Sequence, residues 1–238
     1  LIGKDKTGAG KVKLMEKRRD ELESEAASLY FQKQTASGIT FAGEKAKSDF
    51  VASIARQIIT PGANRELFIP DLKISPDDRI GITGKNGSGK STFIRNLLSL
   101  INLKKDKIIY IPQEIDENLW AETEKRRKTL NNNELAEVIS AVHRLGSDTE
   151  RVMFSQEPSP GEKRKIILAT GLLKNPSIIV LDEPTNHMDI ESIKSLEEAL
   201  GIFTGAIVIV SHDIAFMKKT VKTVWEIREI GNSANTRR

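Results

Sequence analysis

Three stretches of the chain are unbroken runs of apolar residues, at 108–111, 178–181 and 207–210. Strands that are buried on both faces have this pattern, as in a parallel sheet covered by helices. Elsewhere short β-branched runs alternate with segments of helical periodicity, which predicts an α/β fold with a mainly parallel sheet. We expect strands at 50–55, 67–69, 79–83, 107–111, 178–182 and 206–210, and helices at 91–100, 133–145, 161–173, 190–200 and 214–219.

Two segments of the chain do not follow this alternation of strands and helices. Residues 113–159 are polar and helical in character without β runs, which predicts a helical insertion outside the sheet. We expect the compact domain to span 50–238 and a charged helical arm to occupy 1–49. Residues 1–19 carry seven Lys or Arg and two Asp or Glu. Two interpretations of the arm are open: a solvated helix lying against the domain, or a basic arm that binds a polyanion such as nucleic acid.

Composition excludes several kinds of site in this chain of 238 residues. With no cysteine, there can be no disulfide and no thiolate metal site, and three scattered histidines do not favour a histidine zinc site. The longest uncharged stretch, Ala199 to His212, is shorter than the roughly 20 apolar residues of a membrane span. No signal peptide opens the sequence, so we expect a cytoplasmic protein. The first residue, Leu1, suggests that a longer protein has been cut.

The strongest chemical signal is a glycine-rich segment between a predicted strand and a predicted helix. Residues 84–91 satisfy G-x-x-x-x-G-K-[ST] at every specified position. Glycines allow backbone N–H groups to approach phosphates, and the following helix N-terminus favours an anion. A lysine there reaches the β- and γ-phosphates, and a Ser hydroxyl can bind Mg²⁺. We therefore predict an ATP site with Mg²⁺ at Gly84, Lys85, Asn86, Gly87, Ser88, Gly89, Lys90, Ser91 and Thr92.

Two adjacent carboxylates end the apolar strand at 178–182. Ligands of parallel α/β sheets bind at this edge, so Asp182 is expected to orient Mg²⁺ or its water. Glu183 would point the other way along the strand and polarise the attacking water. Two neighbouring carboxylates are costly without a cation, which favours the metal. Taken alone, the pair could also be a solvated acidic turn.

Two further polar residues follow predicted strands. Gln113, after the strand at 107–111, can reach Mg²⁺ and the attacking water, and His212, after 206–210, can bind the γ-phosphate. A single Gln or His at a strand end is usually a loop residue. Here the ends of four predicted strands carry groups suited to one triphosphate, and we predict that these groups lie close together at one edge of the sheet.

With these residues the chain resembles the ATP-binding cassette (ABC) family over roughly residues 50–230. The resemblance implies a P-loop nucleotide-binding domain with a mainly parallel sheet, a small antiparallel β part and a helical subdomain, preceded by the helical arm. The resemblance implies that Gln113 is the Q-loop residue and a metal ligand with Ser91 and Asp182, Glu183 the general base, and His212 the switch histidine. Residues 182–189 read D-E-P-T-N-H-M-D and resemble the ABC-F subfamily, as do 110–114 and 161–165. That subfamily implies a protein with two cassettes on one chain and no membrane domain, whose charged linker reaches tRNA on the ribosome. Residues 1–49 resemble the end of such a linker, which favours the polyanion interpretation.

The sequence departs from the family in three places. Pro158 and Pro160 flank Ser159 where the family's signature has Leu and Gly, while Ser159, Gly161 and Glu162 keep the groups that contact ATP on the opposite cassette. Proline is tolerated at the first turn of a helix, so we expect a functional but altered signature. Residues 57–64 contain no aromatic residue to stack on adenine. The opposite cassette is absent, and by resemblance Asp189 is the D-loop residue that faces it.

Three functions follow from these observations. The first is an ATPase cassette of a ribosome-binding protein, either a translation factor or one that protects ribosomes from antibiotics. The second is the ATPase subunit of a membrane transporter, which the Thr185-Asn186-His187 segment and the arm disfavour. The third is a regulatory nucleotide-binding module with little turnover, against which Glu183 and His212 argue. We expect the cassette alone to bind Mg–ATP and hydrolyse it slowly.

Overall fold

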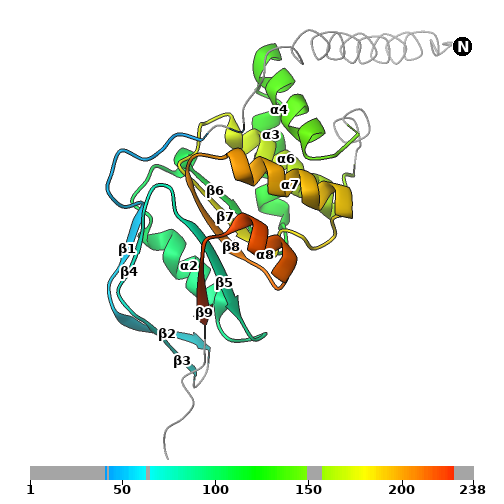
Figure 1. Ribbon diagram of the computed structural model, residues 1–238. Coiled ribbons are helices and arrows are strands. Elements are labelled where there is room, and N and C mark those ends of the chain that lie inside the picture. The colour runs from blue at the N-terminus through cyan, green and yellow to red at the C-terminus, as the bar shows by residue number, and fades with distance from the viewer. Residues whose placement is uncertain (1–40, 42, 63–64, 149–156, 228–238) are drawn as a thin grey trace, which may run out of the picture.

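The computed structural model describes residues 41, 43–62, 65–148 and 157–227 (Figure 1). A five-stranded sheet with the order β6-β7-β8-β5-β9 lies at its centre, and every neighbouring pair is parallel. The strands are β5 (Arg79–Gly84), β6 (Ile108–Ile111), β7 (Ile178–Asp182), β8 (Ala206–Val210) and β9 (Thr223–Ile227). The predicted parallel sheet is confirmed, and β9 is an edge strand that the sequence analysis missed.

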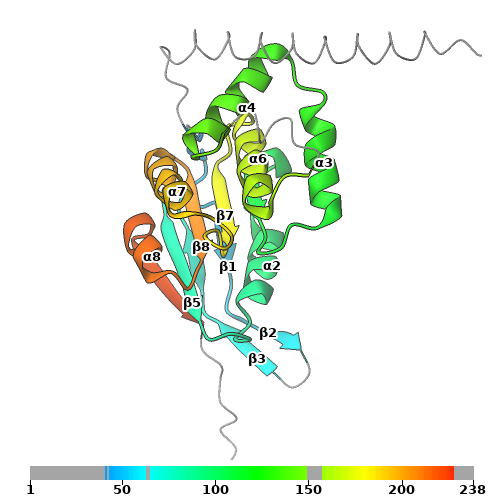
Figure 2. The same cartoon turned by 90° about the vertical axis from the view of Figure 1, so that its right-hand side faces the viewer.

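Alternate residues of the central strands enter two separate hydrophobic clusters, which explains their unbroken apolar sequence. In β7, Ile178 and Val180 belong to one cluster, and Ile179 and Leu181 belong to the other. Helix α2 (Lys90–Leu100) covers the first face. The second face is covered by α4 (Asn132–Arg144), α6 (Pro160–Leu172), α7 (Ile190–Ile202) and α8 (Ile214–Thr220). Figure 2 shows α7 and α8 on one side of the strands and α2 on the other. All five predicted helices are present within one residue or two of their expected ends.

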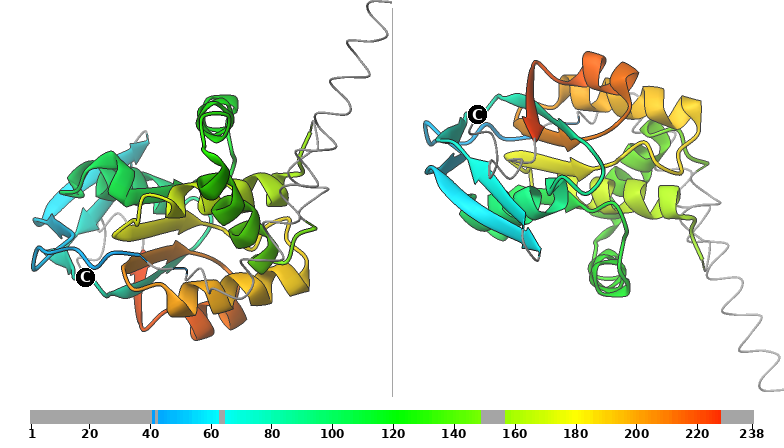
Figure 3. Two further views of the ribbon diagram at one scale, coloured as in Figure 1. Left: turned by 90° about the horizontal axis from the view of Figure 1, so that it is seen from above. Right: turned by 90° about the horizontal axis from the view of Figure 1, so that it is seen from below.

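A small antiparallel part lies beside the parallel sheet, on the side of the molecule away from α7 (Figure 3). Strand β1 (Ala52–Ile54) pairs with β4 (Leu72–Ile74), and β2 (Gln57–Gly62) pairs with β3 (Arg65–Ile69). Ile54, Ile69 and Ile74 are buried against α2, so this part packs on the first face of the sheet. The sequence analysis placed β1 and β3 but not β2 and β4.

The insertion between β6 and β7 is helical where the structure describes it. After the short 3-10 helix η1 (Lys105–Lys107) and β6, helix α3 (Glu117–Arg127) begins at Asp116, whose carboxylate accepts a hydrogen bond from Leu119 N at 2.7 Å. Helices α3 and α4 both pack against α6. Most of the arm expected at 1–49 lies outside the described residues. Within the described part of the chain, none of the helices is long and apolar enough for a bilayer crossing.

Candidate functional site

The phosphate loop joins the end of β5 to the start of α2. Gly89 precedes the helix with φ 98°, a left-handed conformation that glycine adopts without a Cβ penalty. The Lys90 Nζ donates to the carbonyl oxygens of Gly84 at 2.9 Å and Lys85 at 3.1 Å, so the ammonium group is held inside the loop. The Ser88 hydroxyl is buried and has no hydrogen-bond partner among the described residues. This set of donors fits an anion such as a nucleotide phosphate.

Asp182 faces the start of α2 from the end of β7. The Ser91 hydroxyl lies 3.5 Å from the Asp182 carboxylate, which is 4% exposed. Burial and the neighbouring Glu183 raise the pKa of Asp182, while the Ser91 hydrogen bond, Lys90 and Arg164 oppose that rise. A carboxylate destabilised in this way gains from a nearby cation. Ser91 and Asp182, two of the predicted Mg²⁺ ligands, thus lie next to each other in the structure.

Glu183 and His212 lie close together where the neighbouring strands β7 and β8 end. The backbone N–H of His212 donates to Glu183 Oε2 at 3.3 Å, and His212 Nε2 lies 3.5 Å from Glu183 Oε1. Glu183 N donates to Val210 O at 2.8 Å, which anchors the backbone of Glu183 to β8. Glu183 is 7% exposed, whereas just over half of the His212 side chain is exposed. A buried carboxylate beside an exposed imidazole can accept a proton from water that enters from the open side.

Gln113 follows β6, the strand that pairs with β7. Its carbonyl oxygen accepts a hydrogen bond from Arg164 Nη2, so the residue is connected to the rest of the site through its backbone. The side chain of Gln113 lies at the protein surface. The ends of β5, β6, β7 and β8 thus bring Lys90, Ser91, Gln113, Asp182, Glu183 and His212 to one edge of the sheet.

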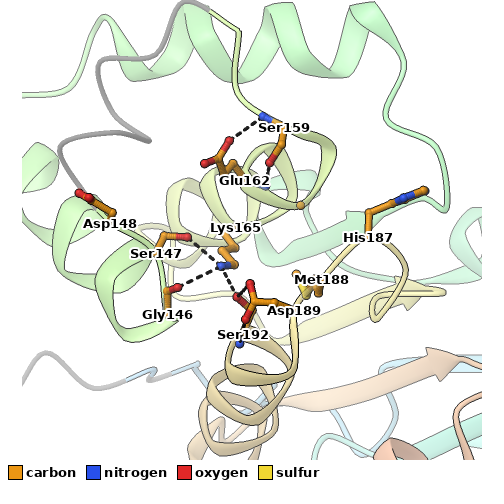
Figure 4. Close-up of a pocket in the computed structure, with 11 residues that line it drawn as sticks. Gly146, Ser147, Asp148, Ser159, Glu162, Lys165, His187, Met188, Asp189 and Ser192 are labelled. Carbon is orange, nitrogen blue, oxygen red and sulfur yellow. Dashed lines mark hydrogen bonds between the residues drawn. The ribbon is translucent and has the colours of Figure 1, made fainter.

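The predicted signature residues line a second pocket, of about 170 Å³, that contains no residue of segment 84–92 (Figure 4). Ser159 is the N-cap of α6: its hydroxyl accepts from Glu162 N at 3.3 Å, and its own N–H donates to Glu162 Oε2 at 2.6 Å. Pro160 occupies the first helical position, where a proline has no hydrogen bond to lose. A Cβ on Gly161 would come within 2.8 Å of His187 O, so this position admits only glycine without a shift.

Asp189 caps α7 on the opposite wall of this pocket. Its carboxylate accepts from Ser192 N and from the Ser192 hydroxyl, both at 2.8 Å. Lys165 crosses between the walls, with Nζ donating to Ser147 Oγ at 2.8 Å and Ser192 Oγ at 2.6 Å (Figure 4). Burial lowers the pKa of Lys165, while Asp189 and Glu162 act against that shift. The expected signature and D-loop segments are therefore joined by a buried lysine.

Sequence reasoning missed Lys165 and its neighbour Arg164, which is 3% exposed. Arg164 Nη1 donates to Asn186 O and Nη2 to Gln113 O. Burial lowers the pKa of Arg164, and Asp182 and Glu183 raise it. The adjacent carboxylates favour a metal, but the chain also provides a cation of its own near them. Residues 161, 164, 165 and 168 share one helical face, a signal that could have identified both.

Ser91 and Asp182 offer two of the oxygen ligands that a magnesium ion needs. Among the described residues, no three His, Asp or Glu side chains gather as a metal site. Mg²⁺ commonly takes one or two carboxylates together with substrate phosphates and water. One carboxylate and one hydroxyl beside a phosphate loop therefore fit Mg²⁺ that arrives with a nucleotide.

Replacing Pro160 with glycine tests whether the unusual signature matters. We expect Pro160→Gly to lower the free energy of unfolding by about 0.5–1 kcal/mol, because glycine gives the unfolded chain more conformations. We also expect it to change the ATPase rate of the full-length protein, since Pro160 fixes the start of α6. Thermal unfolding and steady-state hydrolysis measure the two effects. Pro70→Gly, in the exposed turn after β3, is the control for the entropy effect. An ATPase rate equal to that of this control would show that Pro160 does not tune the signature.

A family model described as ABC transporter matches residues 68–186. The ATP-binding protein Uup of Buchnera aphidicola is 33% identical over 164 residues, which cover 62% of this chain and 27% of that protein. A probable ATP-binding cassette sub-family F member 3 homolog of Encephalitozoon cuniculi is 32% identical over 177 residues, 71% of this chain and 32% of that protein. The chain therefore spans about a third or less of the length of these relatives.

Among solved structures, a bacterial Atm1-family ABC exporter with ATP bound superimposes with a TM-score of 0.61. The match covers 79% of this chain and 39% of that chain at 16% sequence identity. At that identity the likeness establishes the fold alone. The same fold therefore serves a membrane exporter, and the fold does not decide between the candidate functions.

Proposed function

The chain belongs to the ABC transporter family and within it to the F subfamily, and from this membership we propose that it is the ATP-hydrolysing cassette of a two-cassette protein acting on the ribosome. One observation carries the enzymatic part of the proposal. The pairs Ser91–Asp182 and Glu183–His212 lie at the carboxyl ends of adjoining strands, beside a phosphate loop. Ligands of open parallel sheets bind at this edge.

Each residue of this edge has a distinct part in hydrolysis. The amides of 84–92 and the Lys90 ammonium would hold the β- and γ-phosphates, and Ser91, Asp182 and Gln113 would hold Mg²⁺. Bound Mg²⁺ supplies positive charge that offsets the charge developing on the phosphate oxygens. Glu183 accepts a proton from the attacking water, and His212 orients Glu183 and donates to the γ-phosphate.

We propose that the pocket in Figure 4 serves a nucleotide held by a facing cassette. Ser159 stands at the open N-terminus of α6, where a helix favours an anion, and Asp189 stands opposite. This pocket is separate from the phosphate loop of the same chain, so one cassette contributes two different half-sites. We therefore expect slow hydrolysis by the cassette alone. The facing cassette would be another part of the full-length protein or a second copy of this chain.

The ribosome part of the proposal depends on the subfamily and on the basic arm at 1–49, most of which lies outside the described residues. Binding of ribosomal RNA or tRNA by such an arm would be electrostatic. We propose a cytoplasmic protein that acts as a translation factor or protects the ribosome from antibiotics. The transporter alternative remains distinguishable because it requires a membrane partner.

Sedimentation separates these alternatives. We expect full-length protein carrying Glu183→Gln to co-sediment with ribosomes in the presence of ATP, because hydrolysis no longer ends the bound state. Without ATP, or in high salt, the bound fraction should fall, since screening weakens contacts with phosphates. Enrichment with membranes in place of ribosomes would support the transporter function. If, in the presence of ATP, the variant sediments with ribosomes no more than the wild type does, the ribosome proposal is contradicted.

A further inference from the structure

We propose that Arg164 is a positioning residue that connects the signature helix of this cassette to the loops carrying the catalytic and metal-binding groups of the same cassette. The inference rests on the proposed ATPase function and adds a residue outside the phosphate loop and the strand-end groups. Under it, the two half-sites of one cassette are mechanically linked through a single side chain.

The contacts of Arg164 span two strands. Its guanidinium donates one hydrogen bond to Gln113 O, just after β6, and another to Asn186 O, in the loop after β7. These strands are neighbours in the sheet. The planar guanidinium has donors in a fixed fork, so it can fix the separation of two carbonyl oxygens, which the compact ammonium of lysine cannot do. Arg164 therefore sets the distance between the Q-loop backbone and the segment that follows Glu183.

That segment has a backbone that needs support. Glu183 (φ 48°) and His187 (φ 63°) are both non-glycine residues in the left-handed region, one on either side of Asn186. Such conformations cost free energy and persist only where the surroundings impose them. Within the loop, Asn186 N donates to Glu183 O at 3.3 Å. The bond from Arg164 to Asn186 O adds a tie from outside the loop, and so helps to fix the backbone that directs the Glu183 carboxylate.

Charge reinforces this arrangement. Asp182 and Glu183 are adjacent, buried carboxylates, and the positive charge of Arg164 is attracted to both. Arg164 Nε is also buried and has no hydrogen-bond partner among the described residues. Keeping a cation there is costly unless its charge is compensated. The two carboxylates provide that compensation, so the guanidinium and the catalytic edge hold each other in place.

The same helix begins at the pocket shown in Figure 4. Pro160 and Gly161 form the first turn of α6, Arg164 lies in the next turn, and Gly161 packs directly under His187 O. The carbonyl groups of Asn186 and His187 are thus both in contact with α6. A shift of α6 when Ser159 engages a nucleotide on the facing cassette would move this loop, and with it Glu183. The coupling uses one rigid helix and one strained loop.

The test compares Arg164→Gln with Arg144→Gln, a matched change at an exposed arginine of α4. In the full-length protein we expect Arg164→Gln to lower kcat about 10²-fold, with KM for ATP changed less than about threefold, because the phosphate loop is intact while Glu183 is displaced. Mg²⁺ should strengthen the binding of a fluorescent ATP analogue. In Arg164→Gln this gain in affinity should require a roughly tenfold higher Mg²⁺ concentration, because the Gln113 backbone moves. Binding without Mg²⁺ should not change.

The possible outcomes decide between positioning and simple structural support. The proposal would be overturned if kcat of Arg164→Gln falls only as much as the fraction of folded protein falls and the Mg²⁺ dependence is unchanged. Should Arg164→Gln fail to fold, Arg164→Lys keeps the charge without the fork. The proposal then expects the same direction of change in kcat and Mg²⁺ dependence, and a lysine variant indistinguishable from the wild type would overturn it. Absence of ATP hydrolysis in the wild type would instead contradict the proposed function.

Discussion

Replacement of Glu183 by glutamine is expected to lower kcat for ATP hydrolysis by about 10³-fold, within the range for loss of a general base. ATP binding should remain within a few-fold of the wild type. The Glu183 side chain contacts His212, whereas the Lys90 ammonium is held by the carbonyl oxygens of Gly84 and Lys85. Bound but uncleaved ATP should therefore hold two cassettes together.

The geometry makes this a clean substitution. Glutamine has the size of glutamate, and its carbonyl oxygen can still accept the bond from His212 N now made to Glu183 Oε2 at 3.3 Å. What it lacks is the ability to take a proton. The buried position also becomes neutral next to Asp182, which removes a repulsion between two carboxylates. Asp182 still compensates the charge of Arg164, so the variant should fold.

Single-turnover hydrolysis and gel filtration with ATP measure the two parts of this prediction. Glu198→Gln, an identical change at an exposed position of α7, is the control and should leave both unchanged. Hydrolysis at more than about a tenth of the wild-type rate would show that another group removes the proton. Loss of ATP binding would show that Glu183 supports the loop and not the chemistry.

The sequence predicted the elements whose residues are buried on both faces. The unbroken apolar runs in β7 and β8 predicted these strands with their ends in place, since a short apolar run is typical of a strand buried on both faces. The strands that were missed carry weaker signals. Pro61 lies within β2, β4 has three residues, and β9 is an edge strand with Val224 exposed. Pairing with a neighbouring strand, which sequence periodicity cannot show, determines their conformation.

Sequence spacing identified the strand-end groups but not the residue that connects them. Gly84, Asp182 and His212 lie at or just beyond the ends of recognisable strands, so their convergence follows from the topology of a parallel sheet. Arg164 comes from a helix whose rotation about its own axis is fixed by packing against the sheet. Three basic residues directly before the apolar run at 166–168 look like a solvated helical turn, yet Arg164 and Lys165 are both buried. Only the docked helix shows that their partners are carbonyl oxygens and hydroxyl groups.

Replacement of Lys90 by alanine should weaken ATP binding by about 10²–10³-fold, the equivalent of two charge-assisted hydrogen bonds lost to phosphate oxygens. In the structure the Lys90 ammonium already lies within the loop, 2.9 Å from Gly84 O and 3.1 Å from Lys85 O. Little reorganisation is needed for it to reach a phosphate that enters the loop. Isothermal titration with Mg–ATP measures the affinity, and Lys194→Ala on the exposed face of α7 is the control.

A change in stability must be separated from this change in affinity. Alanine at position 90 removes both bonds to loop carbonyls, so thermal unfolding without nucleotide should show a small destabilisation, of about 1–2 kcal/mol. Added Mg–ATP should then raise the melting temperature of the wild type and of Lys194→Ala but leave Lys90→Ala unchanged, since stabilisation by a ligand depends on its affinity. If Lys90→Ala gains as much stability from Mg–ATP as the control, the nucleotide binds elsewhere, and the assignment of loop 84–92 as the phosphate site is wrong.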